Sequence, residues 1–180
     1  CRSSCAAISC CQSSQLPLRR RHPEGEVLFE DVGPDIRHVD RHVGEITALL
    51  KKLGIYQNTL MFFTSDNGAA KRFDGIHNSS GVMQGKKRSL NEGGIRVPMV
   101  VRWPGKIKAG RVSSHPWYFP DVMPTFAEIG GVSTEVPEDI DGISILPTLL
   151  DKGVQKQHEY MFWQYGVRAV RSGKWKGIGK

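Results

Sequence analysis

Two neighbouring polar residues, Asp66 and Asn67, lie in the stretch "TSDNG" (residues 64–68), which follows directly on an apolar segment, residues 59–63. An anionic carboxylate oxygen beside a neutral amide oxygen suits a hard cation such as Ca²⁺ or Mg²⁺. Two ligands are too few for either ion, so other segments would have to supply the rest. The sequence Asp-Asn-Gly is also a common turn, in which the side chains bond nearby backbone groups. These two residues alone therefore leave a metal site and an ordinary turn open.

Lys87 lies downstream in a polar, glycine-rich segment, "GKKRSLNEGGIRVP" (residues 85–98). Such a lysine is commonly a solvated surface charge. Beside a metal and an anionic substrate it would instead stabilise the negative charge that develops in a transition state. The run Glu92, Gly93, Gly94 allows a tight turn into the next strand, and Arg96 could pair with a carboxylate there and fix the loop.

The elements that must position these residues are those of an α/β protein. Val39, Val43, Ile46, Leu50 and Leu53 recur at helical spacing, and Lys51, Lys52 and Gly54 suit the end of that helix. A continuous apolar run, residues 59–64, predicts a strand that is covered on both faces. Helix, short loop and buried strand together predict a mainly parallel sheet flanked by helices. Residues 96–103 predict another strand, with Pro98 at its start or at an edge.

The remaining segments predict a loop-rich second part. Residues 65–95 are polar and glycine-rich, and a loop of that length is usually functional or disordered. Residues 121–131 predict a short helix, and residues 139–153 a loop that leads into a helical turn. The tail predicts a small antiparallel β-hairpin that turns at Ser172 and Gly173. We expect a poorly ordered leader in residues 1–34, one α/β unit in residues 35–130 and a C-terminal subdomain in residues 131–180.

Composition narrows the class of protein. The 180 residues carry a net charge of +7, which favours an anionic partner or a solvated basic surface, and no recognised nucleic-acid motif is present. No apolar stretch approaches the roughly 18 residues of a membrane span. Cys1, Cys5, Cys10 and Cys11 lack the paired spacing of a zinc site, so disulfides or a leader are expected. Asn78 begins an Asn-Ser-Ser glycosylation pattern. No oligomeric state is indicated.

Several blocks resemble, in order, the later part of the type I sulfatases, in particular the arylsulfatase and N-acetylgalactosamine-6-sulfatase group. The blocks are "DRHVGEITALLKKLGIYQNT", "NTLMFFTSDNG", "GKKRSLNEGGIRVPMVVRWPG", "DVMPTF" and "VRAVRSGKWK". The resemblance implies an alkaline-phosphatase-like fold and hydrolysis of sulfate esters around a bound Ca²⁺. It implies that Asp66 and Asn67 are metal ligands and that Lys87 contacts the substrate sulfate as a catalytic residue. His22 is a possible counterpart of an upstream family histidine.

The departures from the family are equally informative. The family nucleophile, a formylglycine made from Cys/Ser-x-Pro-Ser-Arg, has no match, because "CRSSC" (residues 1–5) has Ser3 and Cys5 where the motif needs Pro and Arg. The paired N-terminal aspartates of the Ca²⁺ shell are also missing. We therefore expect a partial domain, the C-terminal half of a sulfatase catalytic domain with its C-terminal subdomain, that is inactive alone.

The expected partner is a sulfated small molecule or a sulfated glycan, with no nucleic acid. The family's context implies a lysosomal or secreted protein. Two alternatives stay open: a phosphoester or phosphonate hydrolase of the same fold, and a catalytically inactive protein that binds Ca²⁺ or polyanions.

Overall fold

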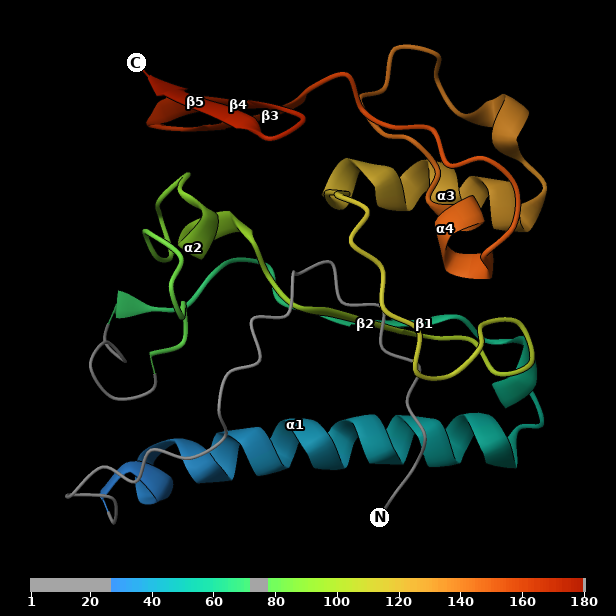
Figure 1. The fold of residues 1–180 in the computed structure, drawn as a ribbon. Coiled ribbons are helices and arrows are strands. Elements are labelled where there is room, and N and C mark those ends of the chain that lie inside the picture. The colour runs from blue at the N-terminus through green and yellow to red at the C-terminus, as the bar shows by residue number, and fades with distance from the viewer. Residues whose placement is uncertain (1–26, 72–77, 180) are drawn as a thin grey trace.

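The computed structural model describes residues 27–71 and 78–179 (Figure 1). A long helix lies along one side of a two-stranded sheet, and two short helices and a second sheet lie on the other side of that pair. Within these residues no helix combines the length and the apolar character that crossing a membrane requires.

Helix α1 (Val27–Lys52) confirms the predicted helix but begins earlier than Asp35. It ends where the sequence indicates, because Gly54 has a φ of +73° and the Ile55 N–H returns to the Leu50 carbonyl at 3.1 Å. Its apolar stripe stays largely exposed: the exposed fractions are 47% for Val39 and 53% for Ile46, and Leu53, which follows the helix, is 58% exposed. A 3₁₀ turn, η1 (Tyr56–Asn58), leads from this helix into the first strand.

Strands β1 (Met61–Thr64) and β2 (Met99–Arg102) lie where strands were predicted, but they pair antiparallel. Their register places Phe62 opposite Val101. A parallel pair needs a crossover connection, usually a helix of several turns, and the described part of the connection from β1 to β2 contains only the single-turn helix α2 (Glu92–Ile95). Both sheets of the described residues are antiparallel, so the predicted mainly parallel sheet is not found there.

The hydrophobic core is built around β2. Its buried residues come from β2, the segment after it and the α4 region: Met99, Val101, Trp103, Ile107, Ile145 and Leu149. Phe62 of β1 packs against this cluster, whereas Phe63 is 50% exposed. The apolar run of β1 is therefore covered on one face rather than on both.

A buried carboxylate joins the helices of the second part. Asp121, fully buried, ends the 3₁₀ turn η3 (Phe119–Asp121) and accepts hydrogen bonds from the Tyr118 N–H at 3.0 Å and the Ile143 N–H at 2.8 Å. His158 Nε2 lies 2.8 Å from Asp121 Oδ1. These bonds tie helix α3 (Val122–Gly130) to the segments that carry helix α4 (Leu146–Leu150) and the C-terminal sheet. The turn η4 (Ser133–Glu135) follows α3.

The C-terminal sheet has three antiparallel strands, β3 (Met161–Tyr165), β4 (Val167–Ser172) and β5 (Trp175–Gly179). The predicted hairpin with its turn after Ser172 is confirmed, and β3 adds a strand to it. Of the earlier expectations, those for His22 and for Cys1, Cys5, Cys10 and Cys11 lie outside the described residues.

Candidate functional site

Asp66 and Asn67 lie in the turn that follows β1. Thr64, the last residue of β1, donates its hydroxyl to the Pro98 carbonyl at 3.0 Å, which ties the end of the strand to the segment entering β2. The Ser65 hydroxyl donates to the Asn67 carbonyl at 2.9 Å and shapes the turn. Asp66 is exposed and Asn67 is half-buried, so the Asp66 carboxylate faces solvent.

Backbone hydrogen bonds hold the segment of Lys87 against this turn. The Gly68 N–H donates to the Gly94 carbonyl at 2.8 Å, and the Lys87 N–H donates to the Ala69 carbonyl at 2.9 Å. The Lys87 side chain is exposed. The structure thus brings together the two segments that the sequence singled out, although many residues separate them.

Three glycines make this close approach possible. A Cβ on Gly68 would overlap the Gly93 carbonyl oxygen, one on Gly93 would overlap the Gly85 carbonyl oxygen, and one on Gly94 would overlap the Ser89 carbonyl oxygen. No side chain fits between these backbones. Glycine is therefore required here because the two segments approach so closely, and not because the backbone adopts an unusual φ.

Glu92, at the start of α2, contacts three cationic side chains. Its Oε1 accepts a hydrogen bond from Lys176 Nζ at 2.9 Å, and its Oε2 lies 3.8 Å from Arg171 Nη1 and 4.0 Å from Arg96 Nη1. The Arg96 pair agrees with the role expected for Arg96. Arg171 and Lys176 belong to the C-terminal sheet, so the carboxylate joins that sheet to the loop that carries Lys87. Sequence spacing gave no signal for these long-range partners.

The candidate metal site offers ligand atoms of a suitable kind, but too few of them. Asp66 and Asn67 offer the oxygen atoms that a hard cation binds, but Ca²⁺ takes about six to eight. Among residues 27–71 and 78–179 no group of three or more His, Cys, Asp or Glu side chains could hold a metal ion. The residues present therefore fit part of a Ca²⁺ shell.

Asn78, the candidate glycosylation residue, is exposed and has a φ of +43°, a conformation that asparagine tolerates better than most residues. Ser80, the third residue of the pattern, is buried, and its hydroxyl has no hydrogen-bond partner. The acceptor nitrogen of the pattern therefore lies on a surface-exposed residue.

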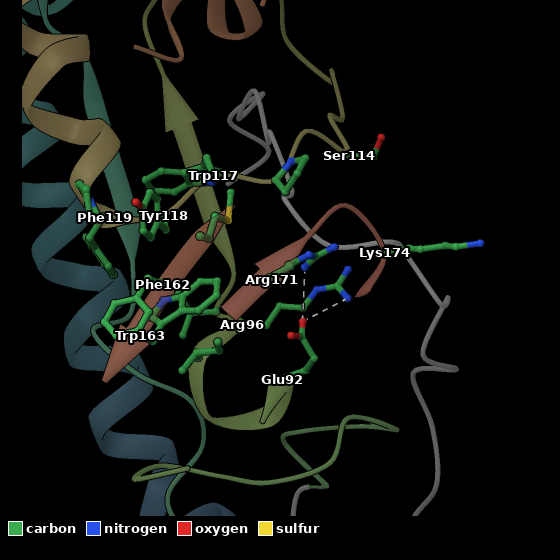
Figure 2. A pocket seen from close by; sticks show the side chains of 15 residues that line it. Glu92, Arg96, Ser114, Trp117, Tyr118, Phe119, Phe162, Trp163, Arg171 and Lys174 are labelled. Carbon is green, nitrogen blue, oxygen red and sulfur yellow. Dashed lines mark ion pairs between the residues drawn. The ribbon is translucent and has the colours of Figure 1, made fainter. Parts of the chain in front are cut away.

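A groove that sequence reasoning missed lies beside Glu92 (Figure 2). It has a volume of about 610 Å³, with aromatic side chains at one end and the Glu92 ion pairs at the other. Burial raises the pKa of Tyr118 in its wall, and the negative charges of Asp141 and Asp121 add to that effect. Burial also lowers the pKa of His115, which stands between the lining residues Ser114 and Pro116, with Asp121 opposing the effect and His158 reinforcing it.

Comparison with known proteins identifies the family. The family model described as Sulfatase matches residues 29–132. The steryl-sulfatase of Mus musculus is 38% identical over 167 residues, which is 86% of this chain and 26% of the relative. The N-acetylgalactosamine-6-sulfatase of the same species is 36% identical over 153 residues, 84% of this chain and 29% of the relative. The chain thus spans about a quarter of the length of these relatives.

Solved structures agree with this result. The PsFucS1 sulfatase from Pseudoalteromonas sp. superimposes with a TM-score of 0.64 and 33% identity, over 77% of this chain and 28% of that one. A phosphonate monoester hydrolase from Silicibacter pomeroyi, at 23% identity and a TM-score of 0.57 over 78% of this chain and 30% of that one, shares the fold alone. The fold and the matched segments point to the same family. The chain belongs to the sulfatase family.

Proposed function

We propose that this chain forms part of a Ca²⁺-dependent sulfatase that hydrolyses sulfate esters of aryl compounds or glycans. The observation that carries the proposal is the pair of backbone hydrogen bonds, Gly68 to Gly94 and Lys87 to Ala69, which holds a basic segment against an Asp-Asn turn. A cation-binding turn beside a lysine is the arrangement needed to bind an anionic ester and to stabilise the charge that develops on it.

The roles follow from the chemistry of each side chain. Asp66 contributes an anionic oxygen and Asn67 a neutral oxygen to the metal shell. When bound there, Ca²⁺ would act as a Lewis acid toward the sulfate oxygens. Lys87 places an ammonium group, which has three donors and no acceptor, on the same sulfate. The exposure of Asp66 and Lys87 leaves both side chains accessible to an incoming substrate.

The nucleophile belongs to a different segment in this proposal. The 180 residues contain no Cys/Ser-x-Pro-Ser-Arg run from which a formylglycine could form. We therefore expect residues 35–130 to act as the C-terminal half of a catalytic domain, residues 131–180 as its C-terminal subdomain, and the isolated chain to turn over no ester.

The substrate and the setting are proposed on chemical grounds. The net charge of +7 favours a sulfated small molecule or a sulfated glycan over a neutral substrate. The exposed Asn78 is compatible with glycosylation, and with it a lysosomal or secreted location.

The test uses the longer protein that we propose contains this chain, assayed with 4-methylumbelliferyl sulfate. Asp66→Ala and Lys87→Ala should each lower kcat by at least about 100-fold, the usual cost of losing one group that stabilises transition-state charge. Lys108→Ala, which removes an exposed charge elsewhere, is the matched control and should leave kcat unchanged. Normal turnover by a folded Asp66→Ala variant would refute the metal-ligand assignment.

Assays on the same longer protein distinguish the sulfatase from two alternative functions. Faster hydrolysis of a phosphonate monoester than of the sulfate would favour the phosphonate hydrolase alternative, which the shared fold keeps open. Binding to heparin that falls steeply with salt, with no hydrolysis of either ester, would favour an inactive polyanion-binding protein.

A further inference from the structure

We infer that the groove beside Glu92 binds a sulfate ester carried on a hydrophobic ring system, with the rings against its aromatic end and the sulfate against its arginines. The residues that carry the inference are Trp117, Phe119, Phe162, Trp163, Arg96 and Arg171. Asp66, Asn67 and Lys87 do not line this groove. The choice of sulfate as the anion rests on the proposed function, whereas the ring-plus-anion character rests on the groove itself.

Neighbouring side chains pack against the aromatic residues of the groove, but part of their surface remains exposed. Trp117 packs between Phe62 of β1, at a ring separation of 6.5 Å, and Phe119, at 6.1 Å. Trp163 is braced by Tyr118 at 5.8 Å and by the Lys176 ammonium at 5.4 Å. Phe119 and Phe162 nevertheless remain 49% and 42% exposed. Apolar rings that stay exposed in a concave site are a feature of ligand pockets.

At the charged end of the groove, positively charged side chains outnumber the negatively charged one. One carboxylate, Glu92, faces three cations, and its shortest contact, 2.9 Å, goes to Lys176. The two guanidinium groups that line the groove sit farther away, at 3.8 Å for Arg171 and 4.0 Å for Arg96. Each guanidinium has five N–H donors, and these ion pairs engage few of them. A sulfate oxygen placed there would accept charge-assisted hydrogen bonds.

The geometry joins these two features in one ligand. Figure 2 shows Trp117, Tyr118, Phe119, Phe162 and Trp163 grouped to one side of Arg96 and Arg171. The volume of about 610 Å³ lies within the usual range of roughly 300–1,000 Å³ for small-molecule pockets. A ligand with an apolar body and one anionic end satisfies both ends of the groove at once.

A hydrophobic ring body fits better than a sugar. The uncharged hydrogen-bonding side chains of the lining are those of Ser114 and Tyr118 and the indole N–H groups of Trp117 and Trp163. The indoles donate only, and the Tyr118 hydroxyl is already donated to the Asp141 carbonyl at 3.3 Å. A sugar would bury hydroxyl groups that need partners, and unpaired polar groups are costly to bury. Fused steroid rings or a single aryl ring make no such demand.

The experiment titrates the 180-residue chain with estrone 3-sulfate and follows the indole N–H signals of its four tryptophans by NMR. The signals of Trp117 and Trp163 should move together, while those of the buried Trp103 and the exposed Trp175, neither of which lines the groove, stay in place. Inorganic sulfate and unsulfated estrone should each bind at least about tenfold more weakly, because each occupies one end alone. Equal binding of inorganic sulfate, or shifts confined to Trp103 and Trp175, would overturn the inference.

Matched variants test the two ends separately. Arg171→Gln and Phe162→Ala should each raise the dissociation constant about tenfold, and Arg171→Lys should recover part of the loss. Lys108→Gln is the control, since Lys108 is exposed and does not line the groove, and it should change the constant less than about twofold. A larger effect of Lys108→Gln than of Arg171→Gln would show that general charge, not the groove, holds the ester.

Further titrations identify which kind of ring the groove prefers and distinguish this groove from the proposed active site. Tighter binding of 4-methylphenyl sulfate than of the steroid sulfate would assign the groove to small aryl esters, and tighter binding of N-acetylgalactosamine 6-sulfate would overturn the hydrophobic ring. Asp66→Ala should bind estrone 3-sulfate normally. Normal groove binding without any hydrolysis in the longer protein would refute the proposed function while leaving this inference intact.

Discussion

Replacing Glu92 by Gln tests whether the C-terminal sheet holds the loop that carries Lys87. The change keeps the shape of the side chain and removes its charge, so Arg96, Arg171 and Lys176 are left facing one another. It should also weaken the hydrogen bond from Lys176, whose side chain is only 16% exposed.

The expected loss follows from the contacts. A hydrogen bond to a charged group contributes about 1.5–3 kcal/mol when shielded, but Glu92 is 31% exposed, so we expect about 1–2 kcal/mol from the whole cluster. For a chain of this size the melting temperature should fall by roughly 2–8 °C.

The assay is thermal unfolding followed by circular dichroism at low and at high salt. The matched control is Glu45→Gln, because Glu45 pairs with Arg41 at 3.4 Å on the surface of α1, with both side chains 62% exposed. This exposed pair should contribute less than about 1 kcal/mol. A double-mutant cycle with Lys176→Gln isolates the interaction between the two residues. The reasoning fails if Glu92→Gln lowers the melting temperature no more than Glu45→Gln does, or if the cycle gives no coupling.

Three further predictions follow from other features. Gly94→Ala should destabilise the chain by at least about 1–3 kcal/mol in urea unfolding, since its Cβ would overlap backbone, whereas Gly177→Ala, with nothing within 4 Å, should cost far less. Asp121→Asn should cost about 2–4 kcal/mol, because the buried carboxylate serves two backbone N–H groups and His158; the exposed Asp139→Asn is its control, and similar losses for both would contradict the network. Burial lowers the pKa of His115, so the unfolded chain takes up a proton near the ordinary value of 6.5 before the folded chain does, and the free energy of unfolding should fall as pH drops below about 6.5. His115→Gln should flatten that fall in a series of urea titrations, and an unchanged slope would refute the assignment.

Local patterns predicted local structure well. The apolar run before Asp66 predicted β1, the repeat of Val39, Val43 and Ile46 predicted α1, and the sequence around Ser172 and Gly173 predicted the hairpin. In each case the information lies within a few residues of the element, where propensity and periodicity act. The pairing of Arg96 with a nearby carboxylate is of the same kind, since Glu92 lies one helical turn away.

Pairings between distant segments could not be predicted in this way. The contact of Glu92 with Lys176 and that of Asp121 with His158 join residues whose spacing has no periodic signature. The antiparallel pairing of β1 and β2 was missed for a related reason, because an apolar run gives no information about the direction of its neighbour. The groove was missed because its aromatic and cationic ends come from three separate parts of the chain.

The uncovered stripe of α1 has a practical consequence for anyone who handles this chain in solution. Val39, Ile46 and Leu49 of α1, together with Leu53 just after it, present apolar surface to water. Burial of apolar surface is driven largely by entropy near room temperature, so its strength increases on warming from the cold. Association of the chain with itself should therefore grow with both concentration and temperature, and cold, dilute conditions with mild detergent should preserve single molecules for measurement.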